Sequence, residues 1–160
     1  MNRTAAIDIG TNSTRLLVVE KTGGGLKIVE SRLSTTRLGK GIGAGKLLPG
    51  AMERTIDAVG EFHRKALQLN AGRVVAAATS AVRDAVNRAE FLDLVRRKTG
   101  LEVRVLSGEE EAALSYRGVL SGLAVDPEST VVMDVGGGST ELIWTEEGRL
   151  RLASVNAGAV

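Results

Sequence analysis

Hydrophobic positions alternate along the first third of the chain, recur at helical spacing in its middle, and alternate again near its end. Alternation predicts strands, and helical spacing predicts helices with one apolar side. The predicted strands are Thr4–Ile9, Arg15–Glu20, Lys27–Thr36, Val74–Ala78, Glu102–Leu106, Thr130–Val135, Thr140–Glu146 and Arg149–Val155. The predicted helices are Ala51–Leu69, one from Asn87 to about Lys98, and one that follows Ser107 and ends near Gly122. This order, β-β-β-α-β-α-β-α and then β-β-β again, predicts an α/β fold.

Local signals mark where several of these elements begin. Asn87 with Glu90, and Ser107 with Glu110, have the three-residue spacing of a capping box, which predicts a helix start at each. The segment 37–50 holds five Gly and one Pro, so we expect no regular element in it. The predicted strand at 74–78 is wholly apolar, which is typical of a strand covered on both faces.

The later strands repeat the first ones. The segment 6–20 (AIDIGTNSTRLLVVE) aligns without gaps on 132–146 (VMDVGGGSTELIWTE), and six of the 15 positions are identical. We therefore expect a first domain over 1–125 and the start of a second, similar domain over 126–160. The second copy has three strands without following helices, as in the front part of a longer protein. Its apolar face would need cover from another chain or from a segment that folds back, or the copy would stay partly disordered.

Composition removes several classes of protein. With 43% hydrophobic and 25% charged residues the chain is globular, and the lack of cysteine excludes disulfides and thiolate zinc sites. Two Phe, one Trp and one Tyr offer few surfaces on which bases could stack, so we expect no nucleic-acid partner. No apolar run approaches the ~20 residues of a membrane helix. The N-terminus also lacks the layout of a signal peptide, and we expect a cytoplasmic protein with no membrane partner.

Charge is distributed unevenly along the chain. Residues 1–72 carry 11 Lys and Arg against 6 Asp and Glu, a net of +5, whereas residues 73–160 carry 10 against 13, a net of −3. A basic half joined to an acidic half suits a site where a polyanion meets a metal ion. An ordinary solvated surface explains the same distribution equally well.

The pattern strand–Asp–x–Gly–turn–strand occurs once in each copy. A turn rich in Gly, Ser and Thr exposes several backbone N–H groups and hydroxyls, which together bind anions. An Asp just before the turn would repel phosphate unless a hard cation such as Mg²⁺ bridged them. The alternative is a pair of ordinary hairpins in which each Asp satisfies local N–H groups. The candidate residues are Asp8, Gly10, Thr11, Asn12 and Ser13 in the first turn and Asp134, Gly136, Gly137, Gly138 and Ser139 in the second.

Two further residues are candidates for chemistry. Acidic residues favour a helix N-terminus through the dipole, and this explains Glu109 and Glu110. Glu111 lies one residue deeper and could orient and deprotonate a water molecule. Arg83 follows the buried strand at the sheet edge where α/β proteins place ligands, and its guanidinium could bind two phosphate oxygens. An ion pair with Asp84, or simple solvation, accounts for Arg83 as well.

Four segments, AIDIGTNSTRLLV, TSAVRDAVNRAEFL, SGEEEAALSYRGV and VMDVGGGSTELI, together resemble the Ppx-GppA family of exopolyphosphatases and guanosine pentaphosphate phosphohydrolases. That family belongs to the actin/sugar-kinase/Hsp70 superfamily. The resemblance covers essentially the whole chain. It implies an actin-like (ribonuclease H-like) domain, followed by the first strands of a second one. It also implies hydrolysis of a terminal phosphoanhydride of inorganic polyphosphate or of pppGpp, with Mg²⁺ or Mn²⁺ as cofactor.

Roles for individual residues also follow from the resemblance. It implies that Glu111 activates water, that Arg83 lies near the bound phosphate, and that Asp134 and Glu141 are associated with the metal and water. The two turns would be the phosphate loops, and we expect them to face each other across one substrate.

Several alternatives stay open. A kinase or ATPase of the same superfamily would share both turns, although the SGEEEA segment argues against it. A non-catalytic sensor of polyphosphate or nucleotide would share them too. The sequence does not separate polyphosphate from guanosine penta- or tetraphosphate. Family members continue well beyond 160 residues, so activity of this stretch alone is in doubt, and the resemblance implies a homodimer.

Overall fold

The computed structural model describes residues 3–42, 45–155 and 157–159. The chain divides into two compact units, Met1–Val105 and Leu106–Val160. The boundary between these units, at 105/106, precedes the one expected from sequence at 125/126. The reason is that the helix Gly108–Gly122 packs on the second sheet.

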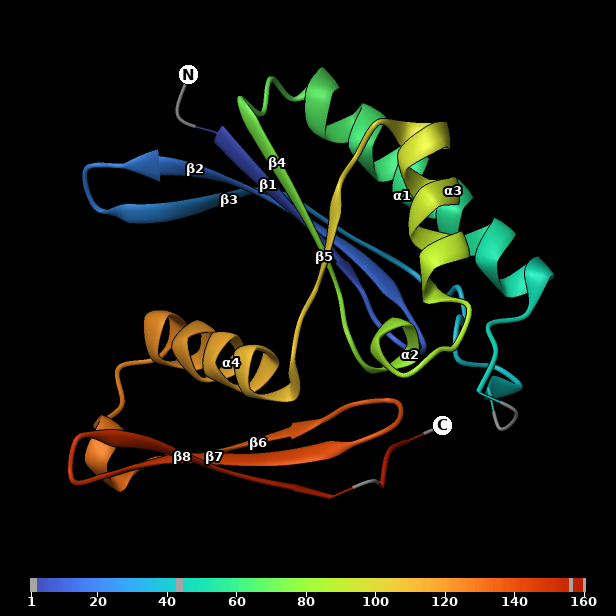
Figure 1. Ribbon diagram of the computed structural model, residues 1–160. Coiled ribbons are helices and arrows are strands. Elements are labelled where there is room, and N and C mark those ends of the chain that lie inside the picture. Colours follow the sequence, from blue (N-terminus) through green and yellow to red (C-terminus); the bar gives the residue numbers. More distant parts are fainter. Residues whose placement is uncertain (1–2, 43–44, 156, 160) are drawn as a thin grey trace. The chain divides into compact units, whose positions relative to one another are not determined.

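The first unit is built on a five-stranded sheet with the order β3-β2-β1-β4-β5 (Figure 1). Strands β1 and β4 are parallel, as are β4 and β5, whereas β2 is antiparallel to both β1 and β3. The carboxyl ends of β1 and β4 therefore lie side by side, with Ile9 opposite Ala78. The strands are β1 (Arg3–Ile9), β2 (Thr14–Thr22), β3 (Gly25–Ser34), β4 (Arg73–Ala78) and β5 (Val103–Val105).

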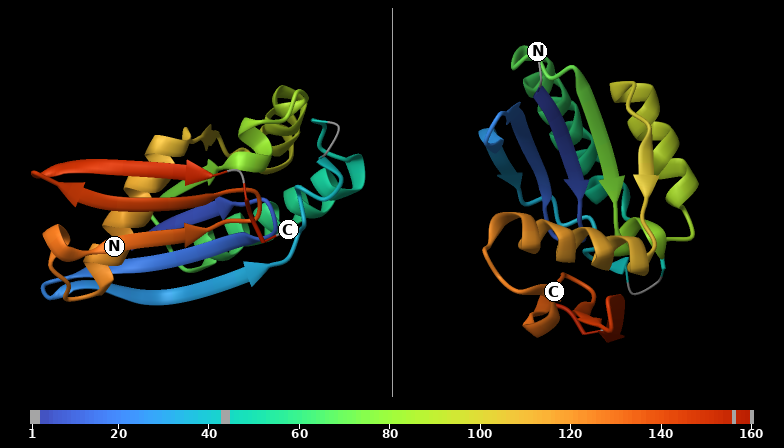
Figure 2. Two further views of the ribbon diagram at one scale, coloured as in Figure 1. Left: turned by 90° about the horizontal axis from the view of Figure 1, so that it is seen from below. Right: turned by 90° about the vertical axis from the view of Figure 1, so that its left-hand side faces the viewer.

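Helices α1 (Pro49–Gln68) and α3 (Arg88–Thr99) contact each other and cover one face of this sheet (Figure 2, right). A short helix, α2 (Ser80–Arg83), follows β4. Side chains alternate between buried and exposed along β1 and β2, as their sequence pattern predicts. The core side chains from these strands and helices include Ile7, Ile9, Leu16, Val18, Ile56, Val59, Phe62, Phe91 and Val95.

Two local predictions in the first unit are wrong. Asn87 makes no capping bond to α3; its side-chain oxygen accepts from the Leu47 N–H at 2.9 Å, and its amide donates to the Leu47 carbonyl at 3.1 Å. Asn87 thus fastens the segment before α1 instead of capping its own helix. Strand β4 is not covered on both faces, since Val75 is 40% exposed on the side away from α1 and α3.

The second unit has one helix and one small sheet. Helix α4 (Gly108–Gly122) precedes the 3₁₀ turn η2 (Pro127–Ser129) and three antiparallel strands in the order β6-β7-β8. A two-residue turn with positive φ at Glu147 and Gly148 joins the last two strands, as hairpins of this type require. The strands are β6 (Val131–Val135), β7 (Thr140–Glu146) and β8 (Arg149–Val155).

Helix α4 covers one face of this sheet. Ala112 and Tyr116 pack on Val132 and Ile143, and the Tyr116 hydroxyl donates to the Pro127 carbonyl at 3.0 Å. The sequence placed this helix in the first domain and left the second sheet without a helix of its own. In the structure α4 packs on one face of this sheet, and the other face leaves Val131, Met133, Val135 and Leu142 exposed.

The two copies of the repeat bury opposite faces. Leu16 and Ile7 of the first copy are each 1% exposed beneath α1, whereas the equivalent Leu142 and Met133 are 41% and 65% exposed. The reverse holds for the alternate positions: Ile143 is fully buried under α4 and its equivalent Leu17 is exposed. In the residues that the structure describes, α1 lies over the face of the first sheet that holds Ile7 and Leu16, and α4 lies over the opposite face of the equivalent strands.

Candidate functional site

The first Gly-rich turn connects β1 to β2 at the carboxyl edge of the larger sheet. The Gly10 N–H donates to the Ser13 carbonyl at 3.0 Å and closes the turn. Asp8 lies on the sheet face opposite α1, directly across from Arg15 on β2 and beside Ala77 on β4. A carboxylate and a guanidinium are therefore neighbours at the base of this turn. Sequence reasoning did not select Arg15.

The segment after β4 reaches the same turn. The Thr79 N–H donates to the Ile9 carbonyl at 3.3 Å, and the hydroxyls of Thr11 and Ser80 share a hydrogen bond of 2.8 Å. Helix α2 then places Arg83 three residues beyond Ser80, half-buried, with its Nε 3.5 Å from Asp84 Oδ1. The structure thus brings the TSAVRD segment against the first turn, and Arg83 has the Asp84 partner that the sequence had left as an alternative.

A third segment packs on this turn. The Arg37 N–H donates to the Asn12 carbonyl at 2.9 Å, and the Gly39 N–H donates to the Thr11 carbonyl at 2.9 Å. A Cβ at position 39 would lie 2.3 Å from Thr11 Cγ2, so a larger residue here would force the Thr11 side chain or its turn to move. Sequence reasoning placed these residues in an irregular loop; its residues 43–44 lie outside the described part of the chain.

The second Gly-rich turn, between β6 and β7, has the same closing bond. The Gly136 N–H donates to the Ser139 carbonyl at 2.8 Å, and Ser139 is buried. The last described residues pack on this turn, since the Ala159 N–H donates to the Gly136 carbonyl at 3.0 Å and Thr140 Oγ1 donates to the Ala157 carbonyl at 2.6 Å. The repeat predicted from sequence is thus also a repeat of turn geometry.

Two carboxylates lie together at the base of the second turn. Asp134 and Glu141 are direct cross-strand partners on β6 and β7. Both carboxylates accept hydrogen bonds from serines: Ser115 Oγ donates to Asp134 Oδ2 at 2.6 Å, and Ser154 Oγ donates to Glu141 Oε1 at 3.1 Å. Glu141 is only 5% exposed. Carboxylates on two cross-strand partners offer hard oxygen ligands to a cation.

Glu111 lies in the same unit as this pair, in the first turn of α4. The predicted capping box is present: the Glu110 N–H donates to Ser107 Oγ at 3.1 Å, and the Ser107 N–H donates to Glu110 Oε2 at 3.0 Å. Glu110 is therefore engaged in the cap, as expected, and Glu111 is half-buried one residue further on. Ser115, which bonds Asp134, follows Glu111 by one helical turn.

The two serines on the carboxylates were missed by the sequence reasoning, although signals for both exist. Ser115 stands four residues after Glu111, a spacing that places both on one side of a helix. Ser154 is the cross-strand partner of Glu141, which the two-residue turn at Glu147 and Gly148 fixes by register.

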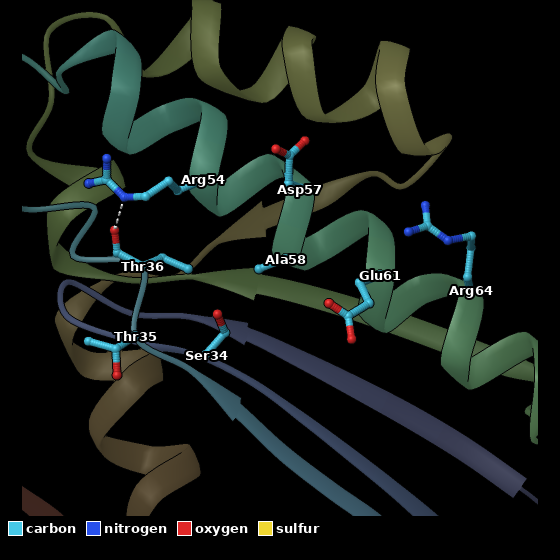
Figure 3. Close-up of a pocket in the computed structure, with 8 residues that line it drawn as sticks. All are labelled: Ser34, Thr35, Thr36, Arg54, Asp57, Ala58, Glu61 and Arg64. Atoms are coloured by element: carbon cyan, nitrogen blue, oxygen red, sulfur yellow. Dashed lines mark hydrogen bonds between the residues drawn. The ribbon is translucent and has the colours of Figure 1, made fainter.

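A groove of about 430 Å³ lies between the end of β3 and α1 (Figure 3), but it holds none of the candidate residues. Its two arginines are balanced by two carboxylates. Arg54 Nη1 donates to the Gly50 carbonyl at 2.8 Å, and Arg54 Nε donates to the Thr36 carbonyl at 3.3 Å. The bond to Thr36 connects α1 to the segment after β3. The groove is lined by Ser34, Thr35, Thr36, Arg54, Asp57, Ala58, Glu61 and Arg64.

The donor set at Asp134 and Glu141 fits a hard divalent ion. Mg²⁺ is usually held by one or two carboxylates, and substrate phosphates and water complete its coordination. In the part of the chain that the structure describes, no three Asp, Glu or His side chains gather closely enough to hold a metal by themselves. The pair therefore suits an ion that is shared with a phosphate.

None of the helices in the described ranges is both long and apolar enough to cross a membrane.

The mixed sheet, the duplicated hairpin and its Gly-rich turns define an α/β protein of the actin-like fold. Residues 17–160 match the model of the Ppx/GppA phosphatase family. The chain belongs to this family.

Individual relatives agree with this assignment. Exopolyphosphatase 2 of Mycobacterium tuberculosis is 37% identical over the whole chain and 53% of its own length. Exopolyphosphatase 1 of Mycobacterium bovis is 34% identical over 88% of this chain and 41% of its own. The crystal structure of an exopolyphosphatase from Cytophaga hutchinsonii superimposes with a TM-score of 0.91 at 30% identity, over 98% of this chain and 51% of that one. The chain thus spans about half the length of these relatives.

Proposed function

We propose that this chain carries the phosphate-binding and water-activating part of a phosphoanhydride hydrolase that releases terminal phosphate from inorganic polyphosphate. One observation carries the proposal. The Asp134–Glu141 pair lies at the base of a Gly-rich turn, and helix α4, which holds Glu111 in its first turn, is hydrogen-bonded to Asp134 through Ser115. Metal ligands, an anion-binding turn and a base are the components that hydrolysis of a phosphoanhydride requires.

Asp134 and Glu141 are the residues that would hold Mg²⁺, with Mn²⁺ as a substitute. When bound, the ion would neutralise charge on the phosphate oxygens. The carboxylates are already oriented by Ser115 and Ser154, so binding requires little rearrangement of their side chains.

The remaining roles fall to backbone and side-chain donors. The N–H groups and hydroxyls of each Gly-rich turn bind phosphate oxygens, and Arg83 supplies a planar, bidentate donor. Glu111 orients a water molecule and accepts its proton as the water oxygen attacks the terminal phosphorus. The bond from that phosphorus to the bridging oxygen breaks, and the shortened polyphosphate leaves with the electron pair on that oxygen. Little covalent catalysis is needed, because positioning and charge neutralisation supply most of the rate in phosphoryl transfer.

Polyphosphate is the proposed substrate because the relatives named above are exopolyphosphatases. Guanosine pentaphosphate ends in the same phosphoryl group and is the second proposed substrate, as the name of the Ppx/GppA family suggests. The cytoplasmic location and the homodimer stay predictions of the sequence.

The test is phosphate release by the complete gene product that contains this chain. Long-chain polyphosphate and pppGpp are compared, each with Mg²⁺ and with EDTA. Release from polyphosphate that requires Mg²⁺ supports the proposal. Transfer of the phosphoryl group from ATP to an acceptor other than water would instead assign a kinase. Binding of both compounds without release would assign a sensor.

A further inference from the structure

The hydrogen bond between Ser115 and Asp134 joins the helix of the proposed base to the proposed metal ligands. Ser115 Oγ donates to Asp134 Oδ2 at 2.6 Å, a short hydrogen bond for a hydroxyl donor. A serine inside a helix commonly donates to the carbonyl four residues earlier in its own helix. The Ser115 hydroxyl instead donates out of the helix, to a side chain on β6.

This bond also fixes where Glu111 lies along the sheet. Residues four apart on a helix share one side and are separated by a single turn. Because Ser115 is held at Asp134, the start of α4 is held at a set position relative to β6 and β7. A shift of α4 along its axis would move Glu111 and break this bond together.

A second serine acts on the other carboxylate. Ser154 on β8 is the cross-strand partner of Glu141 and donates to its Oε1 at 3.1 Å. The two serines thus approach the carboxylate pair from different elements, α4 and β8. Each serine donates to one oxygen of its carboxylate.

The packing of α4 on the second sheet does not require a hydroxyl group at position 115. Ala112 and Tyr116 already pack α4 on Val132 and Ile143, and Tyr116 is further fixed by its hydrogen bond to Pro127. Serine is also a weaker helix former than alanine. An alanine at position 115 would therefore keep the packing and lose only the bond to Asp134.

We propose that Ser115 is a positioning residue: it orients Asp134 for the metal ion and sets the place of Glu111 relative to the Asp134–Glu141 pair. The inference rests on the proposed function, since it assigns Ser115 a part in the same site. Residues that orient metal ligands typically change metal affinity by 10- to 100-fold when they are removed.

The test compares three substitutions in the 160-residue chain. Ser115→Ala removes the hydroxyl, and Ser115→Thr keeps it. Ser121→Ala is the matched control, because Ser121 is exposed on the same helix and donates only to the Gly118 carbonyl.

Mn²⁺ binding is followed by the loss of the free-ion paramagnetic resonance signal, and thermal unfolding is recorded for each variant. We expect Ser115→Ala to weaken Mn²⁺ binding about tenfold. Ser115→Thr and Ser121→Ala should stay within about twofold of the unsubstituted chain.

Steady-state kinetics of the complete gene product give a second measurement. Because Ser115 does not bind the substrate itself, Ser115→Ala should lower kcat for polyphosphate about tenfold while KM changes less than about twofold. Threonine should restore most of the lost kcat. A fall in unfolding temperature shared by Ser115→Ala and Ser115→Thr, with equal losses of Mn²⁺ binding, would show a purely structural role and overturn the inference.

Asp134→Asn separates failure of the inference from failure of the proposed function. If Asp134→Asn loses Mn²⁺ binding and Ser115→Ala does not, the role of Ser115 is wrong and the metal assignment stands. If Asp134→Asn binds Mn²⁺ as well as the unsubstituted chain, or if that chain binds none, the metal assignment fails and the inference fails with it.

Discussion

Asp134 and Glu141 are direct cross-strand partners, at the positions that Asp8 and Arg15 hold in the first copy of the repeat. The first copy therefore pairs a carboxylate with a guanidinium, and the second pairs two carboxylates. Opposite charges on neighbouring strands attract, and like charges repel. The second copy keeps an unfavourable pair, which is expected of residues retained for a cation.

Replacing Glu141 separates the destabilising repulsion between the two carboxylates from their proposed role in metal binding. We expect Glu141→Gln to weaken Mn²⁺ binding by at least about tenfold, because one of two carboxylate ligands is lost. Without metal, the same change should raise the free energy of unfolding by about 0.5 kcal/mol, since it removes the repulsion of like charges. Calorimetric Mn²⁺ titration and urea unfolding in EDTA measure the two effects. The control is Asp8→Asn, which should leave Mn²⁺ binding unchanged; an equal loss there would contradict the assignment to the second copy.

Glu111→Gln tests the proposed base. The amide keeps the size of the side chain but cannot accept a proton from water. General bases contribute about 10²- to 10⁴-fold, so phosphate release by the complete gene product should fall at least about 100-fold while polyphosphate binding persists. Glu109→Gln, in the same helical turn and exposed, should retain activity. Unchanged turnover in Glu111→Gln would remove Glu111 from this role.

Much of this site was predictable because its parts are local in sequence. The Asp-x-Gly turns, the Ser107–Glu110 capping box and the strand order come from patterns that span a few residues each. Contacts between distant segments were not predictable in this way. The bond of Ser115 to Asp134 depends on α4 folding back on the second sheet, and no local pattern shows which sheet a helix will cover.

Gly39→Ala tests the packing of the segment after β3 on the first Gly-rich turn. The added methyl would lie 2.3 Å from Thr11 Cγ2, so Thr11 must rotate or its turn must move. Either change breaks the bond between Thr11 and Ser80. We expect affinity for tripolyphosphate to fall about tenfold, as measured by calorimetry, which corresponds to the loss of about one hydrogen bond. Gly24→Ala, with no atom within 4 Å of its added Cβ, is the control and should bind normally.

Asn87→Ala tests the unexpected role of this residue. The substitution removes the side-chain partners of the Leu47 N–H and of the Leu47 carbonyl. Leu47 is buried, with only 2% of its surface exposed. Unpaired buried polar groups cost about 1–3 kcal/mol each, so urea unfolding should show a loss in that range or above it. Gln68→Ala, at the exposed end of α1, should change the free energy of unfolding by less than about 0.5 kcal/mol. A loss for Asn87→Ala as small as that of the control would show that water replaces the amide.

The failed capping prediction at Asn87 has a physical reason. The spacing of Asn87 and Glu90 is compatible with a capping box, but the same amide can bond both backbone groups of a distant extended segment. A side chain that makes two bonds to the Leu47 backbone is not available to its own helix. The prediction for β4 failed similarly, because an apolar run does not show whether a helix arrives on one face or on both.

Equivalent positions in the two copies differ in burial, so we expect them to differ in how far a charged side chain destabilises the fold. Leu16→Lys places a cation in the core of the first unit and should unfold it, whereas Leu142→Lys should leave the helical circular dichroism intact. Leu142→Lys should also reduce binding of a hydrophobic dye, because the open face of the second sheet exposes Val131, Met133, Val135 and Leu142. Equal loss of structure in both variants would contradict the difference in packing.

This inversion changes how the duplication has to be interpreted. The two hairpins have matching strand register and turns, yet equivalent side chains in them contact different helices. A substitution tolerated at one site therefore gives no guidance for its counterpart: Leu16 and Leu142 are the same residue, yet one is buried and the other exposed. Within the described residues, the two turns share one pattern of closing hydrogen bonds, while the strands beside them contact different helices.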